Sequence, residues 1–204
     1  MIKTIFWDFD GVILDSMKIK GDGFVELFQE YENQYLKKIE EYHYANGGIS
    51  RFDKIRYFYN EIINQDISED KILILADKFS IIIEKKLYDK SNLIFDSVSF
   101  IKKNYYKYNF HIVSGAEHNE LNKLCDYFEL SIYFKSIDGS PIKKDILIQN
   151  ILKQYNYKKE ESILIGDSFS DYNASINNSI DFYGYNNNNL KEFKYIEKFE
   201  GFYL

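Results

Sequence analysis

The sequence contains very few of the residues that cross-link a chain or break its regular structure. One cysteine, Cys125, and one proline, Pro141, occur in 204 residues. A single cysteine excludes an intramolecular disulfide, and a lone cysteine in an amphipathic helical pattern is more often a small core residue than a nucleophile. No signal-peptide pattern precedes the first motif, and no apolar run is long enough to cross a bilayer. We therefore expect a protein of the reducing cytoplasm with no membrane partner.

Positive charge is also in short supply. The chain carries 26 basic and 32 acidic residues, for a net charge of -6, and the basic residues form no stripe. Nucleic acids and anionic membranes are therefore poor partners. Aromatic residues are abundant, with 19 Tyr and 17 Phe, but they are spread over the whole length. This distribution favours core packing over a stacking platform for bases.

The hydrophobic pattern predicts an α/β fold with one large helical insertion. A buried parallel strand is expected at residues 2–7, whereas residues 16–92 show only helical periodicity. Strands and helices then alternate, which is typical of a doubly wound, Rossmann-like parallel sheet. We expect a core of residues 1–15 and 93–204, interrupted by an all-helical domain at 16–92. The expected strands are 110–113, 132–134, 162–165 and 180–185, the expected helices are 96–105, 117–128 and 143–155, and 186–189 form a polar loop.

Two aspartates close the first strand. Asp8 and Asp10 are one residue apart, so they point to the same side, and Gly11 lets the backbone turn sharply after them. Ligands of open α/β sheets bind at the carboxyl ends of the strands. Two crowded carboxylates repel each other, and a hard divalent cation such as Mg²⁺ offsets that repulsion. For this motif taken alone, a turn with two solvated acids is the simpler alternative.

Three later segments place residue types that bind phosphate or metal at strand ends or just beyond them. The segments are Ser114-Gly115, Lys143-Lys144 and Asp167 with Asp171. Ser114-Gly115 offers a hydroxyl and an unobstructed backbone amide for phosphate oxygens. Lys143-Lys144 places positive charge at the start of a helix, where the helix dipole disfavours it. Asp167 and Asp171 are four residues apart, which puts two acids on one helix face. Each alone also fits a plain turn, a surface lysine or a helix N-cap. Their recurrence at successive strand ends favours one shared site.

In order and spacing these motifs resemble the four motifs of the haloacid dehalogenase (HAD) superfamily, in its phosphoglycolate phosphatase and β-phosphoglucomutase-like branch. The motifs are Asp8-x-Asp10-Gly11 with Asp15-Ser16, Ser114-Gly115, a lysine at 143 or 144, and Gly166-Asp167-x-x-x-Asp171. The resemblance covers essentially the whole chain and makes residues 16–92 the helical cap. It implies a Mg²⁺-dependent phosphatase, monomeric or homodimeric, acting on a small phosphorylated metabolite such as a sugar phosphate or phosphoglycolate.

The resemblance also implies a role for each motif residue. Asp8 is the expected nucleophile, which forms an aspartyl-phosphate, and Asp10 is the expected general acid and base. Mg²⁺ is expected on Asp8, the backbone carbonyl of Asp10, Asp167 and waters, with Asp171 as a ligand or a supporting anchor. The expected phosphate-binding residues are Ser114, Gly115, Gly11 and one lysine, Lys144 or Lys143.

Two features bear on the lysine and on the reaction type. Many family members carry the lysine directly before a proline, whereas here Ser140-Pro141 precedes both lysines. This arrangement resembles a Ser-Pro-x-x-Lys variant, so we favour Lys144 and keep Lys143 as a close second. Dehalogenases of the superfamily lack the second aspartate of the first motif, and the transport ATPases have threonine there. Asp10 therefore points to phosphatase or phosphomutase chemistry.

A loop inside the helical block is the expected determinant of substrate choice. Gly47 and Gly48 allow a tight turn between two helices, and Arg51 and Lys54 follow. An arginine at such a loop can reach a carboxylate, a sugar hydroxyl or a second phosphate, and Lys54 lies one turn later. An ordinary turn with a solvated arginine is the alternative. No two histidines of the chain have metal-ligand spacing.

Three other functions compete with a phosphatase. A sugar phosphomutase shares all four motifs but must shield its aspartyl-phosphate from water. A receiver-type signalling domain also uses acids, a hydroxyl residue and a lysine around Mg²⁺, yet it lacks an insertion as long as residues 16–92. A non-catalytic phosphate-binding protein is disfavoured because all the catalytic residue types are present.

Overall fold

Six parallel strands form the central sheet, in the order β3-β2-β1-β4-β5-β6. The computed structural model describes the whole chain, residues 1–204. The strands are β1 (Thr4–Trp7), β2 (Asn109–Glu117), β3 (Ser136–Ser140), β4 (Ser162–Gly166), β5 (Asp181–Tyr185) and β6 (Tyr195–Ile196). The strand order reverses beside β1, which pairs with β2 on one side and β4 on the other. The crevice at the carboxyl end of β1 is therefore the topological switch point, where such sheets bind ligands.

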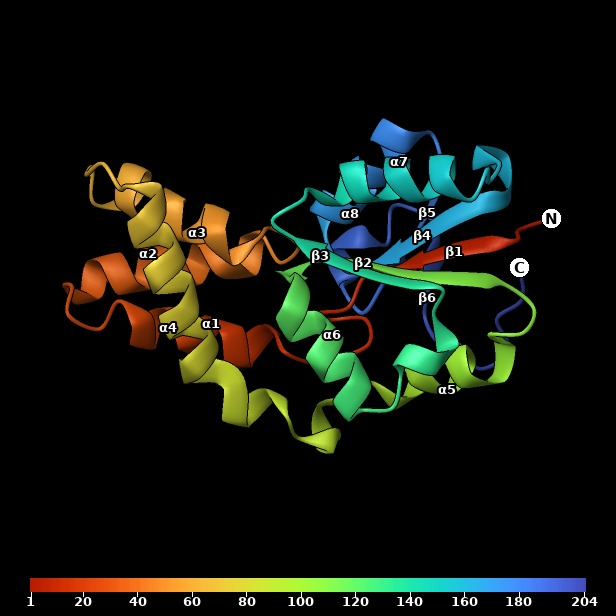
Figure 1. The fold of residues 1–204 in the computed structure, drawn as a ribbon, viewed down its shortest axis with the longest axis horizontal. Coiled ribbons are helices and arrows are strands. Elements are labelled where there is room, and N and C mark those ends of the chain that lie inside the picture. Colours follow the sequence, from red (N-terminus) through yellow and green to blue (C-terminus); the bar gives the residue numbers. More distant parts are fainter.

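Helices cover both faces of the sheet (Figure 1). On one face lie α7 (Lys144–Gln154) and α8 (Phe169–Asn178), and on the other lie α5 (Phe95–Asn104) and α6 (His118–Tyr127). Side chains of β1 alternate between the faces, so Ile5 and Trp7 belong to one core cluster and Phe6 belongs to the other. Because both faces are covered, every residue of β1 is buried. The expected doubly wound sheet is confirmed.

The segment between β1 and α5 is a bundle of helices beyond the carboxyl ends of the strands (Figure 1). Its helices are α1 (Met17–Leu27), α2 (Asn33–Ala45), α3 (Arg51–Tyr57), continued by a π-helical turn (Phe58–Ile62), and α4 (Glu69–Leu87). Phe24 of α1 stacks on Phe79 of α4, with ring centroids 4.3 Å apart. The Ser50 hydroxyl caps α3 by accepting a hydrogen bond from the Asp53 amide at 3.2 Å. No helix is both long and apolar enough to span a membrane.

The structure corrects one expected strand. Residues 132–134 do not form a strand, because Ser131–Tyr133 make a 3-10 helical turn and Ile132 is 76% exposed. The edge strand β3 begins at Ser136 instead. The sequence of β3 is Ser-Ile-Asp-Gly-Ser. As an edge strand it pairs with β2 alone, and its polar residues show no hydrophobic alternation that would predict a strand. The lone Cys125 is fully buried in the core, as expected, and burial raises the pKa of its thiol to about 12.

Candidate active site

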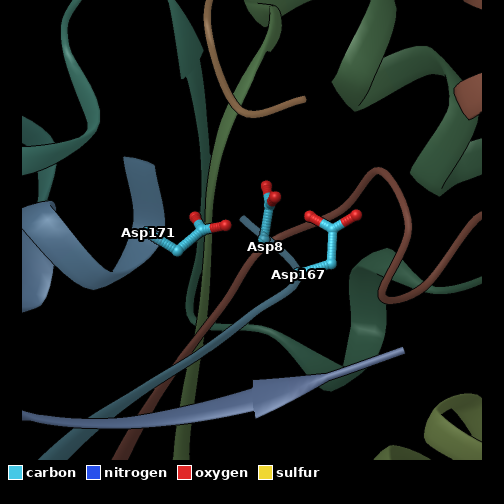
Figure 2. Close-up of side chains that lie close together, drawn as sticks. All are labelled: Asp8, Asp167 and Asp171. Atoms are coloured by element: carbon cyan, nitrogen blue, oxygen red, sulfur yellow. The ribbon is translucent and has the colours of Figure 1, made fainter. Parts of the chain in front are cut away.

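Three carboxylates converge at the carboxyl ends of β1 and β4 (Figure 2). They belong to Asp8, Asp167 and Asp171, and one oxygen of each lies within 4.8 Å of an oxygen of each of the others. Asp8 directly follows β1, Asp167 directly follows β4, and Asp171 lies in the first turn of α8. The parallel pairing of β1 with β4 ends both strands at the same edge of the sheet, which brings these distant residues together.

Asp8 presents one oxygen that the protein leaves unused. Its Oδ1 accepts a hydrogen bond from the Phe9 amide at 2.8 Å and lies 2.9 Å from Lys144 Nζ, whereas its Oδ2 accepts none. The residue is 2% exposed. Burial, reinforced by the charge of Asp171, raises the pKa of Asp8 to about 7, although Lys144 opposes the shift. The negative charge of Asp8 is therefore only partly compensated within the protein.

Lys144 links Asp8 to Asp171. Its buried ammonium forms ion pairs with both carboxylates, and their charges raise the pKa of Lys144 despite the opposing effect of burial. Asp171 is itself held by Ser168, because its Oδ2 accepts hydrogen bonds from the Ser168 amide at 3.1 Å and from the hydroxyl at 2.5 Å. This capping box begins α8. Asp171 thus orients both the helix and the lysine.

Asp167 has no hydrogen-bond donor for its side chain. Burial, together with the charges of Asp8 and Asp171, raises the pKa of Asp167 well above its usual range. Three carboxylates around one lysine leave an excess of negative charge, and a donor set made only of oxygens suits Mg²⁺. The residues present therefore fit a magnesium ion at this position.

Gly11 is the residue that makes room for Asp167. Its φ is +76°, and a Cβ atom there would lie 2.0 Å from Asp167 Oδ2. The position therefore excludes a side chain both by backbone conformation and by space. Two side-chain amides of the loop after β5 tie these segments together, since Asn186 Nδ2 donates to the Gly11 carbonyl at 2.9 Å and Asn187 Nδ2 donates to the Asp167 carbonyl at 2.7 Å. The polar loop expected at 186–189 thus holds the Gly11 and Asp167 segments together. Its composition alone did not predict this role.

Asp10 is not among the three converging carboxylates, because its side chain faces the cap. Its Oδ1 accepts a 2.5 Å hydrogen bond from the Ser16 hydroxyl, and its Oδ2 lies 2.5 Å from Lys20 Nζ of α1. Burial alone would raise the pKa of Asp10, but the charge and hydrogen bond of Lys20, aided by Ser16, lower it. Sequence motifs did not identify Lys20. The sequence does contain one signal. Lys20 follows Ser16 by four residues, a spacing that puts both side chains on the same face of helix α1.

Ser114 and Gly115 lie on β2, next to β1, under the cap. The buried Ser114 hydroxyl accepts a hydrogen bond from the Ala116 amide at 3.1 Å. A Cβ atom on Gly115 would lie 2.5 Å from the Gly48 carbonyl oxygen. Glycine at this position therefore allows the cap loop to touch the core strand.

Gly48 makes a second close approach to the core. A Cβ atom there would lie 2.0 Å from Ser170 Oγ and 2.7 Å from Ser168 Oγ, at the start of α8. The cap loop therefore rests directly on the core, and the cap is closed. Beside this contact lies a cleft of about 350 Å³, whose lining includes Gly48, Gly115 and both Lys143 and Lys144. Lys143 is exposed there at the N-cap of α7, so of the two lysines only Lys144 reaches the carboxylates.

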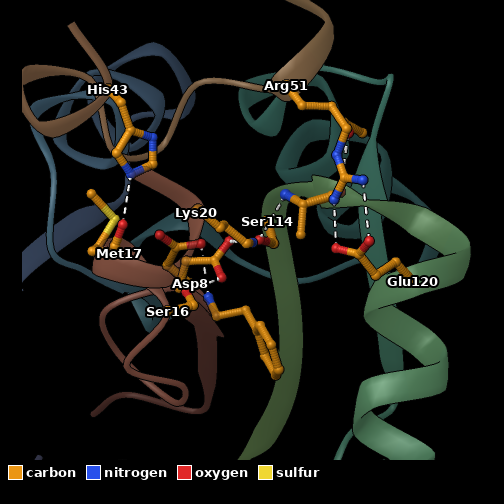
Figure 3. A network of polar contacts seen from close by, with 12 residues as sticks. Asp8, Ser16, Met17, Lys20, His43, Arg51, Ser114 and Glu120 are labelled. Atoms are coloured by element: carbon orange, nitrogen blue, oxygen red, sulfur yellow. Dashed lines mark hydrogen bonds and ion pairs between the residues drawn. The ribbon is translucent and has the colours of Figure 1, made fainter. Parts of the chain in front are cut away.

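Arg51 has partners other than those expected for a substrate-binding arginine. Its guanidinium donates to Glu120 of α6 at 2.5 and 3.1 Å (Figure 3). It also donates to Ser80 of α4 at 2.5 Å. In the closed cap this buried side chain therefore joins the cap to the core rather than extending free into the cleft. Lys54 is also buried, and it lies 3.0 Å from His43 Nδ1. Glu120 was not identifiable from the sequence because its partner Arg51 lies on another helix.

The sequence matches the haloacid dehalogenase-like hydrolase family over residues 5–185. No curated protein matches it. Solved structures share the fold. The β-phosphoglucomutase from Clostridium difficile has 18% identity and a TM-score of 0.78, covering 100% of this chain and 94% of that chain. A predicted phosphatase from Clostridium acetobutylicum has 15% identity and a TM-score of 0.75, with coverages of 97% and 94%.

A third solved structure, the HAD-hydrolase YfnB from Bacillus subtilis bound to magnesium, has 18% identity and a TM-score of 0.70, with coverages of 98% and 96%. At these identities the structures establish the common fold, whereas the family match rests on the sequence itself. That match includes all four motif segments and both halves of the sheet domain around the site. The chain therefore belongs to the haloacid dehalogenase-like hydrolases.

Proposed function

We propose that this enzyme is a magnesium-dependent phosphatase that hydrolyses a small phosphorylated metabolite through an aspartyl-phosphate on Asp8. The proposal rests on the different hydrogen bonding of the two oxygens of the Asp8 carboxylate. Its Oδ1 is held by the Phe9 amide and Lys144, while Oδ2 has no hydrogen-bond donor although the residue is buried. A carboxylate oxygen oriented in this way is suited to attack phosphorus.

Asp8 and Asp167 would hold Mg²⁺ directly, with the Asp10 backbone carbonyl as a further ligand. The oxygens of Asp171 are already engaged by Lys144 and Ser168, which favours a supporting role for Asp171. When bound, the ion supplies positive charge to the carboxylates and to the oxygens of the transferring phosphoryl group. Lys144 adds a second positive charge at Asp8, and the Ser114 hydroxyl and Gly115 amide would hold phosphoryl oxygens.

Asp10 would move the protons in both steps. In the first, Asp8 Oδ2 bonds to phosphorus, the ester P–O bond breaks, and protonated Asp10 gives its proton to the leaving alcohol. In the second, water attacks the phosphorus of the aspartyl-phosphate and loses a proton to the Asp10 carboxylate as Asp8 is released. Lys20 and Ser16 stabilise the carboxylate form, which is the form that the second step requires.

The closed cap favours a second candidate, a sugar phosphomutase. Gly48 rests on both Gly115 and α8, and such closure excludes water from an aspartyl-phosphate. Incubation with a sugar monophosphate separates the two reactions. A phosphatase accumulates inorganic phosphate, whereas a mutase accumulates an isomer of the sugar phosphate.

The test of the proposed function is hydrolysis of an aryl phosphate. Phosphate release requires Mg²⁺ and stops reversibly on chelation. The Asp8→Asn variant loses turnover while its circular dichroism spectrum and melting temperature remain those of a folded protein. Asp66→Asn, which makes the same chemical change at an exposed position of the cap, keeps wild-type turnover. Turnover retained by Asp8→Asn would refute the nucleophile, and the absence of phosphate release from any metabolite would favour a protein that only binds phosphate.

A further inference from the structure

The solvent-facing side of α4 carries a heptad repeat. On its other side the helix packs into the cap through the buried residues Ile72, Ala76, Phe79, Ile83 and Leu87. Facing solvent, an acidic residue followed by a lysine recurs every seven residues, and an isoleucine follows each of the first two such pairs. The repeat is Asp70-Lys71-x-x-Ile74-x-x-Asp77-Lys78-x-x-Ile81-x-x-Glu84-Lys85, and all eight named residues are exposed. A seven-residue period keeps each kind of residue on one stripe of the helix, as in a coiled-coil seam.

The repeat produces three stripes that run along α4. Positions three and four residues after an isoleucine lie on opposite sides of it on the helix surface. Ile74 and Ile81 therefore form a central apolar stripe, and they are 57% and 73% exposed. The acidic stripe on one side consists of Asp70, Asp77 and Glu84, and the lysine stripe on the other side consists of Lys71, Lys78 and Lys85. Charges of opposite sign thus line the two sides of one apolar seam.

The six charged side chains of these stripes form no ion pair within the chain. The two charged residues of α4 outside the repeat do form such pairs inside the cap. Glu69 lies 2.9 Å from Arg56, and Lys86 lies 4.0 Å from Glu26. The charges of the repeat are therefore available to a partner.

The apolar stripe of α4 forms a ridge between two grooves. Each groove has a volume of about 460 Å³. The lining of one includes Asp77 and Glu84 of the acidic stripe, and the lining of the other includes Lys71 and Lys78 of the lysine stripe. Ile81 lines both grooves, which places it on the ridge between them. In Figure 1, α4 lies in front of the other cap helices. A helix laid along this ridge would therefore have room for its side chains on both sides.

The order of the stripes determines which helix fits this seam. In a parallel pair of α4 helices related by a twofold axis along their length, the acidic stripe of each copy faces the lysine stripe of the other. Asp77 then lies opposite Lys78 of the second copy, and each isoleucine meets its own counterpart. An antiparallel pair would instead set acid against acid and lysine against lysine. Because flanking charges set partner choice and orientation in coiled coils, the pattern favours a parallel pair of identical helices.

We propose that this face of α4 is a self-association surface, through which two copies of the chain form a parallel, twofold-symmetric dimer. Because α4 is already folded on the cap, association avoids the costly nucleation that an isolated short helix requires. The three stripes all belong to the cap, and none of their residues is part of the candidate active site. The inference therefore does not depend on the proposed function.

Sedimentation equilibrium of the full-length chain tests the surface. We expect a dimer for the wild type and about 5- to 30-fold weaker association for Asp77→Lys, because the change replaces two exposed ion pairs of the dimer by repulsion. The double variant Asp77→Lys/Lys78→Asp restores association, since the exchanged charges still oppose each other across the twofold axis. Asp66→Lys, which makes the same change of charge at an exposed cap position outside α4, leaves association unchanged.

Cysteine cross-linking tests the orientation of the two helices. In the parallel dimer Ile81 meets Ile81 of the second copy, so the Ile81→Cys variant forms an intermolecular disulfide on mild oxidation. Lys37→Cys, at an exposed position of α2, does not. The native Cys125 is buried and does not compete.

Three outcomes would overturn the inference. The first is a wild-type protein that remains monomeric, and the second is association that a folded Asp77→Lys protein retains in full. The third is cross-linking that occurs only in a mixture of the Ile74→Cys and Ile81→Cys variants, which is the result that an antiparallel pair predicts. Circular dichroism establishes folding, and Lys78→Asp makes the same test from the lysine stripe if Asp77→Lys does not fold.

Discussion

Arg51 of the cap helix α3 and Glu120 of the core helix α6 form a two-contact ion pair across the boundary between cap and core, at 2.5 and 3.1 Å. The side chains are only 4% and 12% exposed. Arg51 also donates to Ser80 and lies over the ring of Phe79, 5.0 Å from its centroid. A bidentate pair of this kind is specific in geometry as well as favourable in charge. It connects the cap to the core in the closed arrangement, and we expect the two parts to separate when substrate enters.

Breaking this pair should favour the open cap. Removal of one partner leaves a buried charge without compensation, a penalty of about 3–5 kcal/mol that opening relieves by hydration. We therefore expect Arg51→Met to raise KM and to increase the radius of gyration in small-angle X-ray scattering. Arg56→Met is the matched control, because Arg56 lies on the same helix but pairs with Asp53 and Glu69 inside the cap. Equal KM values for the two variants would contradict a role of the pair in closure.

Lys144 should be essential and Lys143 should not. Only Lys144 reaches Asp8 and Asp171, whereas Lys143 is exposed at the cleft. Removing a preorganised charge from a buried site lowers kcat by about 10²- to 10³-fold, so we expect a loss of that size for Lys144→Met. Lys143→Met should retain most of the turnover. Aryl phosphate kinetics with Mg²⁺ would measure both, and the reverse ranking would refute this placement of the lysines.

Gly11 offers a test of the metal site that separates backbone strain from crowding. Gly11 and Gly201 have nearly the same positive φ, +76° and +78°, but a Cβ on Gly201 meets nothing within 4 Å. Backbone strain from alanine should cost about 1–2 kcal/mol of stability at either position, and at Gly11 the clash with Asp167 adds to that cost. Only Gly11→Ala should also weaken Mg²⁺ binding, because its methyl group would occupy the space of Asp167 Oδ2. Calorimetric titration with Mg²⁺ would measure the difference, and similar Mg²⁺ affinities would show that Asp167 is not a ligand.

His111 should make the protein less stable in mild acid. It is fully buried on β2, with Nδ1 2.9 Å from the Ser136 hydroxyl, and burial lowers its pKa to about 4. Between pH 6.5 and pH 4 the unfolded chain binds a proton that the folded protein does not, so the free energy of unfolding falls as pH falls. At pH 5 this contribution amounts to about 2 kcal/mol relative to pH 7.

Urea denaturation at several pH values would measure that slope. His111→Gln should reduce the dependence on pH between 7 and 5, and part of it should remain because His43 is also buried as a neutral ring. His118→Gln, at an exposed position, should leave the slope as in the wild type. An unchanged slope in His111→Gln would show that this histidine does not titrate in the unfolding equilibrium.

The arrangement around Asp8 illustrates what local sequence signals can predict. The apolar run of β1 and the turn at Gly11 are local features, and so are the segments containing Ser114 and Asp167. Asp8 and Asp167 directly follow β1 and β4, whereas Ser114 lies within β2, which runs on to Glu117, beyond the expected end at residue 113, but past the last residue that pairs with β1. Because parallel strands end at a common edge, the convergence of these segments followed from the order of the elements alone. The polar strand β3 had no such signal, and its position was therefore misjudged.

The sequence by itself determined the doubly wound sheet, the helical insertion and the group of acids at the strand ends, since hydrophobic periodicity and motif spacing are properties of short segments. Only the tertiary structure decided that Lys20 faces Asp10, that Arg51 pairs with Glu120, and that Lys54 lies against His43. These pairings join different helices, or the cap to the core. Their distances depend on how the cap packs against the sheet, and no spacing along the chain records that packing.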